Sequence, residues 1–226
     1  MKRGDHRDGS REKILDAAER AFADGGFDGA SLRQIVAAAG VNLATVYYYF
    51  QSKEGLLAAV LQRRFEPLRQ AHLEGLRQLE SKAGGRPLPL EKILEAMLTP
   101  PLRLATGSTK AEQATRRLIG RVVNDPNPQT QRLLSRQHHE IREAYLAAIR
   151  RSAPHLSEPD LQWRFEFFWG ALAFVLCNPV KIEILTGGVC NPSDQRAVMA
   201  QMLKVFGAGF RAPAVTPSRT EKNQRT

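Results

Sequence analysis

Cysteine is scarce in this sequence, which holds Cys177 and Cys190 in 226 residues. Two cysteines cannot build the disulfide framework of a small secreted domain, so a reducing cytoplasm is the expected compartment. Long apolar runs are also missing. The longest nearly apolar stretch, Phe165–Cys177, contains a glutamate and is too short to cross a bilayer, and the first residues hold no apolar signal core. We therefore expect a soluble, cytoplasmic protein that does not associate with a membrane.

Signatures of catalysis and of metal binding are absent as well. We find no Gly-rich phosphate loop, no nucleophile elbow and no convincing carboxylate pair. His138, His139 and Glu140 are consecutive, so on a helix their side chains diverge by about 100° instead of chelating as an i, i+4 pair would. The two cysteines form no CxxC motif. We predict no catalytic residues, no metal and no cofactor, and hence no enzyme.

Positive charge is in excess, with a formal net charge of +10 and a pI near 10.1. Such an excess is typical of proteins that bind polyanions, although it also serves solubility. The excess is uneven: residues 1–65 carry ten basic and eight acidic side chains, whereas residues 103–151 carry ten basic and four acidic ones. From Gly29 to Lys53 there is no Asp or Glu at all. An acid-free segment is what a surface lying against phosphates requires.

Apolar residues recur with helical periodicity along most of the chain, and no run of alternating β-branched residues occurs. We predict an all-α fold. The helices are expected near 10–24, 32–39, 43–50, 53–67, 68–82, 88–105, 109–124, 127–152, 158–178 and 193–210.

Residues Ser31–Phe50 have the pattern of a helix-turn-helix. Ser31 followed by Gln34 predicts a capping box at the start of the helix 32–39. Gly40 provides the left-handed conformation of a tight turn, and Asn42 is a suitable N-cap for the helix 43–50. In this motif the second helix enters the major groove of DNA.

A helical projection of residues 43–50 separates an inner from an outer face. Leu43, Val46, Tyr49 and Phe50 are expected to face the core, and Ala44 and Tyr48 to point outward. Thr45 and Tyr47 flank the outer face. A methyl group, a hydroxyl and two phenols are suited to thymine methyls, base edges and phosphate oxygens, and Ser31, Arg33 and Lys53 can anchor phosphates around them.

The segment ILDAAERAFADGGF, followed by SLRQIVAAAGV and YYYFQSKEGLL, resembles the TetR family of regulators over roughly Arg11–Leu61. The resemblance implies a three-helix DNA-binding domain, which we place at residues 10–52, and a larger helical ligand-binding and dimerisation domain at 53–211. Residues 1–9 and 212–226 are expected to be flexible. Departures are mild, with Asn42 where Ser is frequent and Tyr48 and Tyr49 where His is common.

By position, the resemblance assigns the contacts to a double-stranded DNA operator to Ser31, Arg33, Asn42, Ala44, Thr45, Tyr47, Tyr48 and Lys53. It also implies a homodimer held by the last two long helices and a repressor that a small molecule releases from a palindromic operator. Segments of the C-terminal part, such as SAPHLSEPDLQWRFEFFWGALAF, are similar to a branch that includes regulators of fatty-acid metabolism.

The C-terminal part has its own apolar signal, because FEFFWGALAFVLC at 165–177 is apolar nearly all round and must be covered on both sides. One cover is its own domain, and the other is a second subunit, with the helix 193–210 completing a four-helix bundle. Aromatic and apolar residues of this part could also line a cavity for a small hydrophobic effector, against the plainer reading of a packed core or dimer face. The residues that we expect to line an effector cavity are Met97, Arg117, Leu118, Val122, Trp163, Phe167, Phe168 and Phe174. Arg117 and Arg121, four residues apart, could hold a ligand carboxylate, form a solvated edge or extend a phosphate footprint.

Two other functions stay open from the sequence. An enzyme with an apolar helical pocket would need a catalytic constellation that the sequence does not show. A helical adaptor or small-molecule-binding protein without DNA binding is opposed by the acid-free segment.

Overall fold

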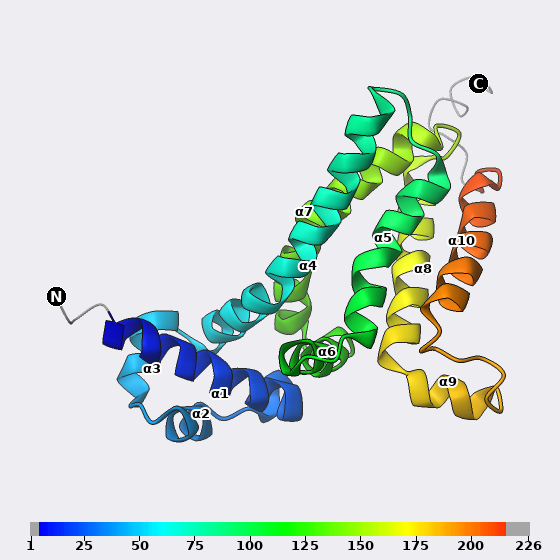
Figure 1. Cartoon of the computed structure of the whole chain (residues 1–226). Helices are drawn as coiled ribbons and strands as arrows, with labels where there is room; N and C mark the ends of the chain where they lie inside the picture. The colour runs from blue at the N-terminus through cyan, green and yellow to red at the C-terminus, as the bar shows by residue number, and fades with distance from the viewer. Residues whose placement is uncertain (1–4, 216–226) are drawn as a thin grey trace, which may run out of the picture. The chain divides into compact units, whose positions relative to one another are not determined.

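The computed structural model describes residues 5–215, and in that range the chain forms helices and no strands (Figure 1). The prediction of an all-α fold is confirmed. The elements are α1 Asp5–Gly29, α2 Leu32–Ala39, α3 Leu43–Phe50, α4 Lys53–Ala83, α5 Leu90–Thr106, α6 Lys110–Val123, α7 Pro128–Ser152, α8 Glu158–Cys177, α9 Pro179–Leu185 and α10 Gln195–Arg211.

The chain divides into two compact units. The first unit holds residues up to Pro67 together with Gly107–His139, and thus α1–α3, α6 and the beginnings of α4 and α7. The second unit holds Leu68–Thr106 and the chain from Glu140 onward. The long helices α4 and α7 therefore each contribute to both units.

The core of the first unit lies between α1, α2, α3 and the start of α4. Its side chains come from the apolar stripes that the sequence predicts on these helices. α1 packs against α2 on one side and against α6 on another. The buried members are Ile14, Leu15, Ala18, Phe22, Ile35, Val46, Phe50, Leu56, Leu57, Val60 and Leu61.

Two helix ends in this unit differ from the predictions. α1 begins at Asp5 and not at Ser10, because good helix formers such as Arg, Lys and Glu follow and a single Gly9 costs only about 1 kcal/mol. At Gly26 the backbone leaves helical geometry (φ 67°, ψ −169°), so the predicted stop at Gly25-Gly26 is a bend, after which a further turn runs to Gly29.

Pro67 lies inside α4 and does not end it. Proline removes one hydrogen bond from a helix interior, but the residues on both sides continue an apolar stripe that packing can hold. The helix predicted at 68–82 is therefore the second half of α4, which extends to Ala83.

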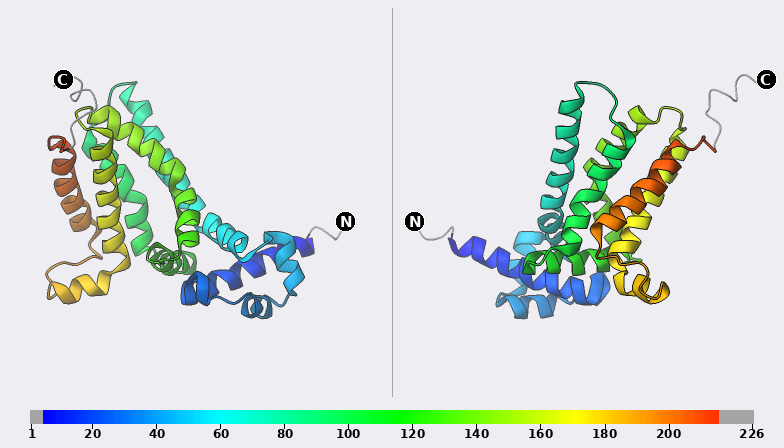
Figure 2. Two further views of the ribbon diagram at one scale, coloured as in Figure 1. Left: turned by 180° about the vertical axis from the view of Figure 1, so that it is seen from behind. Right: turned by 45° about the vertical axis from the view of Figure 1, so that its right-hand side comes forward.

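The second unit is built around α8, which packs against α5 and α10 (Figure 2). Its core includes Met97 from α5, Tyr145 from α7 and Phe168 from α8. The Tyr145 hydroxyl donates a hydrogen bond to the carbonyl oxygen of His72, at 3.1 Å. Burial raises the pKa of this phenol, so it stays neutral and keeps its donor at physiological pH.

The helix α9 was not predicted from the sequence. Pro179 ends α8 as expected, but it also starts a new helix, since proline is well accommodated in the first turn. α9 leaves α8 at an angle of 88° and exposes Val180, Ile184 and Leu185. No single helix within residues 5–215 is both long and apolar enough to cross a membrane, although α8 and α9 taken together meet that test of length and composition.

The ends predicted to be flexible are partly described: residues 5–9 belong to α1, and Arg164 donates hydrogen bonds to the carbonyl oxygens of Ala212 and Pro213. Residues 1–4 and 216–226 are not described, so the expectation for them is not addressed. At the C-terminal end, α10 stops at Arg211, where the sequence places the end of the last helix.

Candidate nucleic-acid interface

The turn between α2 and α3 has the predicted geometry. Gly40 is left-handed (φ 67°, ψ 36°), and its N–H donates to the carbonyl oxygens of Val36 and Ala37. The predicted capping box at Ser31 is wrong: Ser31 is the N-cap residue with extended backbone, but its side chain makes no capping hydrogen bond. The Ser31 hydroxyl is therefore not committed to the helix end, where backbone N–H groups favour an anion.

The start of α3 is held by its predicted cap. Asn42 Oδ1 accepts hydrogen bonds from the backbone N–H and from the hydroxyl of Thr45, both at 2.9 Å. These bonds engage the amide oxygen of Asn42 and the hydroxyl proton of Thr45. The outward hydrogen-bonding groups that remain are the Asn42 amide N–H donors and the Thr45 hydroxyl lone pairs.

The two faces of α3 follow the projection in most positions. Val46 is fully buried and Phe50 is 6% exposed, whereas Tyr47 is 48% and Tyr48 is 68% exposed. Ala44 is exposed and Thr45 half-buried, as predicted for the outer face and its flank. Leu43 was expected in the core, but it is 38% exposed, and that part of the projection is wrong.

A tight turn joins α3 to α4. Gln51 has φ 64° and ψ −35°, and the N–H of Ser52 donates to the carbonyl oxygen of Phe50 at 2.7 Å, which closes a three-residue turn. Ser52 is the cap of α4, as predicted: its Oγ accepts from the N–H of Gly55 at 3.0 Å. This turn fixes the direction of α4 relative to the outer face of α3.

Lys53 opens α4 beside this turn and is half-buried. Its Nζ lies 4.7 Å from the centre of the Phe27 ring, within the range of a cation–π contact. Next to it, the pKa of Glu54 is lowered, chiefly by a hydrogen bond from its backbone and then by one from Ser52. A carboxylate thus marks the edge of the acid-free surface.

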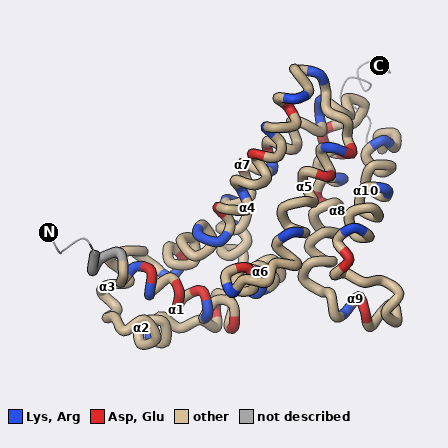
Figure 3. Tube along the Cα trace, in the orientation of Figure 1, with Lys and Arg blue, Asp and Glu red and all other residues tan. Residues whose placement is uncertain are grey.

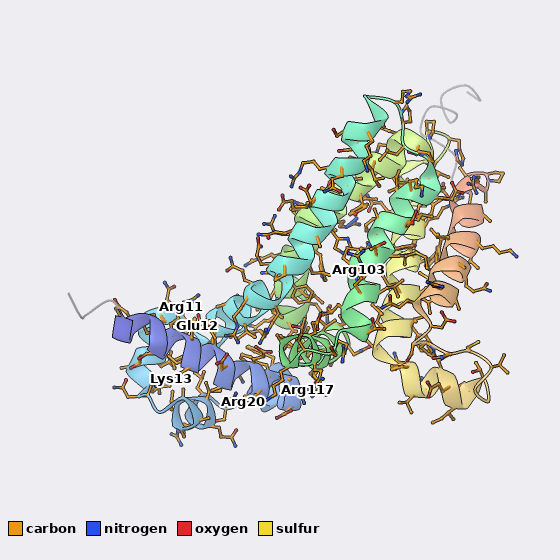
Figure 4. All side chains as sticks on the ribbon, viewed as in Figure 1. Arg11, Glu12, Lys13, Arg20, Arg103 and Arg117 are labelled. Atoms are coloured by element: carbon orange, nitrogen blue, oxygen red, sulfur yellow. The ribbon has the colours of Figure 1, made fainter. Side chains whose placement is uncertain are left out.

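The helices α2 and α3 carry no acidic residue. Their trace shows basic colour on α2 and neither colour on α3, whereas α1 carries both signs (Figure 3). Arg33 is exposed on α2, and α1 exposes Lys13 and Arg20 (Figure 4). These two α1 residues were not among the predicted contacts. Arg11 lies near the end of α3, with its guanidinium 5.7 Å from the centre of the Phe50 ring.

The residues predicted to line an effector cavity are spread over both units. Met97 and Phe168 belong to the core of the second unit, while Trp163, Phe167 and Phe174 are exposed on α8. The other three are on α6 in the first unit: Leu118 and Val122, which are buried, and Arg117, which is exposed (Figure 4).

The two consecutive histidines of α7, His138 and His139, have different surroundings. The His138 ring meets the Phe65 ring edge-on at 4.9 Å, and burial lowers its pKa, so the imidazole is neutral at pH 7. His139 is exposed. Across residues 5–215 the structure brings no three His, Cys, Asp or Glu side chains together as a metal ion would need.

Two family models match the sequence. The one described as bacterial regulatory proteins, tetR family, matches residues 14–60, which include the whole helix-turn-helix. The one described as tetracyclin repressor-like, C-terminal domain, matches residues 95–209, about half of the chain. The chain belongs to the TetR family. The resemblance noted in the sequence is confirmed, and the family consists of DNA-binding transcriptional regulators and not of enzymes.

Curated relatives match mainly the N-terminal part. The HTH-type transcriptional regulator UidR of Escherichia coli K12 is 32% identical over 105 residues, which are 40% of this chain and 54% of UidR. The HTH-type transcriptional repressor NicS of Pseudomonas putida is 39% identical over 69 residues, 30% of this chain and 32% of NicS. This chain therefore spans about half of UidR and about a third of NicS.

Solved structures share the fold over most of their length. SmeT, the repressor of the multidrug efflux pump SmeDEF of Stenotrophomonas maltophilia, has a TM-score of 0.55 at 22% identity, with coverage of 92% of this chain and 96% of SmeT. A Clostridium perfringens protein ascribed to the regulation of fatty acid metabolism has a TM-score of 0.58 at 19% identity, with coverage of 85% and 97%. At such identities the likeness establishes the fold alone.

Proposed function

We propose that the protein is a ligand-responsive transcriptional repressor that binds a palindromic DNA operator as a homodimer. The observation that carries this proposal is the outer face of α3. Ala44, Tyr47 and Tyr48 are exposed side by side on a helix that has no acidic neighbour from Gly29 to Lys53. A large exposed aromatic surface with no acids suits a groove lined by phosphates.

In this function α3 lies in the major groove and the surrounding groups hold the backbone. The Ala44 methyl contacts a thymine methyl, and the phenols of Tyr47 and Tyr48 reach base edges or phosphates. Ser31, Arg33 and Lys53 bind phosphates, and the Asn42 amide and Thr45 hydroxyl add contacts through their outward groups. We assign this role to a DNA-binding domain at residues 10–52 and ligand binding and dimerisation to residues 53–211.

Dimerisation is assigned to α8 and α10. Trp163 and Phe167 are 63% and 59% exposed, and their rings lie 5.5 Å apart on one face of α8. Phe174 continues this stripe, and α10, which packs against α8, exposes Val205. A second copy would cover these residues and present two recognition helices about 34–36 Å apart, one turn of the operator.

The effector is assigned to the class of small hydrophobic molecules. The support is the apolar character of the predicted lining residues, which are Leu118 and Val122 in the first unit and Met97 and Phe168 in the second. The fatty-acyl character suggested by the C-terminal sequence stays a prediction, as do the cytoplasmic location and the contacts of the individual lining residues. Neighbouring genes would narrow this class.

The operator hypothesis predicts different effects for two substitutions. Tyr48→Ala should reduce the preference for duplexes from around the protein's own gene over scrambled duplexes, because a base-reading side chain is lost. Lys53→Ala should weaken binding to both kinds of duplex evenly. It should also reduce the magnitude of the negative slope of log K against log salt by about 1, because one phosphate contact is lost. Fluorescence anisotropy at several salt concentrations measures both. Equal wild-type binding to the two kinds of duplex would contradict the operator hypothesis.

The same assay separates a repressor from an adaptor. Thr45→Ala with Tyr48→Ala removes outer groups of α3 without touching Val46 or Phe50, so helicity should be kept. A repressor loses operator binding, whereas an adaptor keeps its function.

The dimer hypothesis predicts that Trp163→Ala with Phe167→Ala raises the dimer dissociation constant at least about a hundredfold. Exposed aromatic side chains at the centre of an interface each contribute about 2 kcal/mol or more. Analytical ultracentrifugation over a concentration series measures the constant. Tyr47→Ala is the matched control, since it removes a similarly exposed aromatic ring from α3 and should leave the constant unchanged. A monomeric wild-type protein would overturn the dimer hypothesis.

A further inference from the structure

Phe27, near the end of α1, is not among the residues predicted to contact DNA. It follows the bend at Gly26 and is only 7% exposed. Its ring packs into the core of the first unit, where it stacks on the ring of Phe22. The ring centres are 6.3 Å apart, and the angle between the ring planes is 13°. The ring is therefore fixed in orientation by the core.

Three side chains from the corner between α6 and α7 hydrogen-bond to the backbone of Gly25 and Phe27 and to the side chain of Asp28. The N–H of Phe27 donates to Asp125 Oδ2 at 3.4 Å, and Asn127 Nδ2 donates to Asp28 Oδ1 at 3.0 Å. Arg121 Nη2 donates to the carbonyl oxygen of Gly25 at 3.3 Å. We call these three side chains of the corner, Arg121, Asp125 and Asn127, the α6–α7 clamp.

Glycine at position 26 leaves room for the Arg121 side chain of the clamp. Its φ of 67° is in the left-handed region, and a Cβ there would lie 2.9 Å from Nε of Arg121. The bend at Gly26 and the approach of Arg121 thus depend on the same missing side chain. The clamp holds Phe27 from its backbone while the core holds the ring.

The ring of Phe27 also contacts Lys53, whose Nζ lies 4.7 Å from its centre. Lys53 is the first residue of α4, where the helix dipole disfavours a positive charge. The negative face of an aromatic ring offsets that repulsion and holds the ammonium in one place. An ammonium has three N–H donors, so one ring contact leaves donors for a phosphate oxygen.

We propose that Phe27 is a positioning residue for the phosphate contact of Lys53, and that the α6–α7 clamp sets its position. The inference rests on the proposed function, since it requires that Lys53 binds DNA phosphates. It goes further by giving α6 and the α6–α7 corner, which lie outside the helix-turn-helix, a direct route of contacts to the DNA-binding surface.

A double-mutant cycle tests this route. Phe27→Leu removes the ring face and keeps an apolar side chain of similar depth, and it should weaken binding to a scrambled fluorescent duplex about two- to fivefold. Phe27→Trp should preserve binding. In a Lys53→Ala background, Phe27→Leu should have no further effect, because the group that it positions is gone.

The salt dependence distinguishes positioning from a general structural defect. Phe27→Leu should reduce the slope of log K against log salt toward the value of Lys53→Ala, whereas a partly unfolded protein would lose binding in both backgrounds. Site-specific fluorinated phenylalanines at position 27 weaken the ring face without changing its shape, so they should lower affinity stepwise with fluorine number. These variants cover the case in which Phe27→Leu does not fold.

Asp125→Ala tests the clamp, because it removes the acceptor for the Phe27 N–H. It should weaken binding to the scrambled duplex when Lys53 is present and have no effect in the Lys53→Ala background. Equal losses with and without Lys53, or no effect of fluorination, would overturn the inference and leave the proposed function standing. If Lys53→Ala itself did not change the salt slope, the phosphate contact in the proposed function would be wrong, and the inference would fall with it.

Discussion

Replacing Gly55 by alanine is expected to abolish operator binding. An added Cβ at this position would lie 2.0 Å from the carbonyl oxygen of Phe50, far inside the contact distance of carbon and oxygen. That oxygen cannot turn aside freely, because it accepts the 2.7 Å hydrogen bond from Ser52 that closes the turn between α3 and α4. Relief of the clash must therefore open the turn and shift α3, which presents the proposed DNA contacts.

We expect Gly55→Ala to destabilise the first unit by about 3 kcal/mol or more, as strained backbone and lost packing add together. Chemical denaturation followed by circular dichroism measures this loss, and anisotropy with the operator duplex measures binding. Gly75→Ala is the matched control on the same helix, since nothing lies within 4 Å of a Cβ there. It should be neutral or stabilise α4 by up to about 1 kcal/mol. Near-normal operator binding by Gly55→Ala would contradict the observed turn.

The helix-turn-helix was predictable because its signals are local. The buried positions Val46 and Phe50 follow from a period of 3.6 residues, and Gly40 and Asn42 are residue types with a direct preference for their backbone conformation. The requirement for Gly55 was not predictable in this way. It arises from the positive φ of Gln51, which turns the following chain back so that the start of α4 lies against the Phe50 carbonyl oxygen. Glutamine gives no sequence signal for that conformation.

Ser31 shows the limit of a motif that is purely sequential. The spacing of Ser31 and Gln34 fits a capping box, yet the side chain of Ser31 makes no capping bond. Thr109 and Glu112, further along, form a complete capping box in both directions. The spacing permits such a box at either helix, but rotamers and neighbours decide where it forms.

The exposed aromatic residues of α8 illustrate a second limit. The apolar composition of residues 165–177 predicts that this segment is covered. It does not show whether a ligand, the core of the same chain or a partner subunit covers it. The structure divides the set, with Phe168 buried and Trp163 and Phe167 outside. Likewise, Phe27 and Lys53 are far apart in the chain, and only the bend at Gly26 and the start of α4 bring them together.

The second large effect is expected from Glu19, which α1 buries against α4. Glu19 is 4% exposed, and its Oε2 accepts hydrogen bonds from Arg63 Nη2 at 2.6 Å and Arg64 Nε at 2.8 Å. Burial alone would lower the pKa of Arg63, but hydrogen bonds from it to Asp16 and Glu19 outweigh burial and raise that pKa. Because a guanidinium stays protonated in proteins, Arg63 and Arg64 keep their charges when Glu19 is removed.

Glu19→Ala should thus leave two half-buried cations without their shared carboxylate and destabilise the first unit by about 3–5 kcal/mol. Glu12→Ala is the matched control: Glu12 bonds the same Arg63 at 3.1 Å but its side chain is 53% exposed, so the loss should stay below about 1 kcal/mol. Urea denaturation of both variants measures the difference. Adding Arg64→Leu to Glu19→Leu should recover much of the lost stability, because Arg63 keeps Glu12 and Asp16 as partners whereas Arg64 loses its carboxylate, and its unpaired charge carries the cost. An equal loss in the single and double variants would show that packing, and not charge, holds α1 to α4.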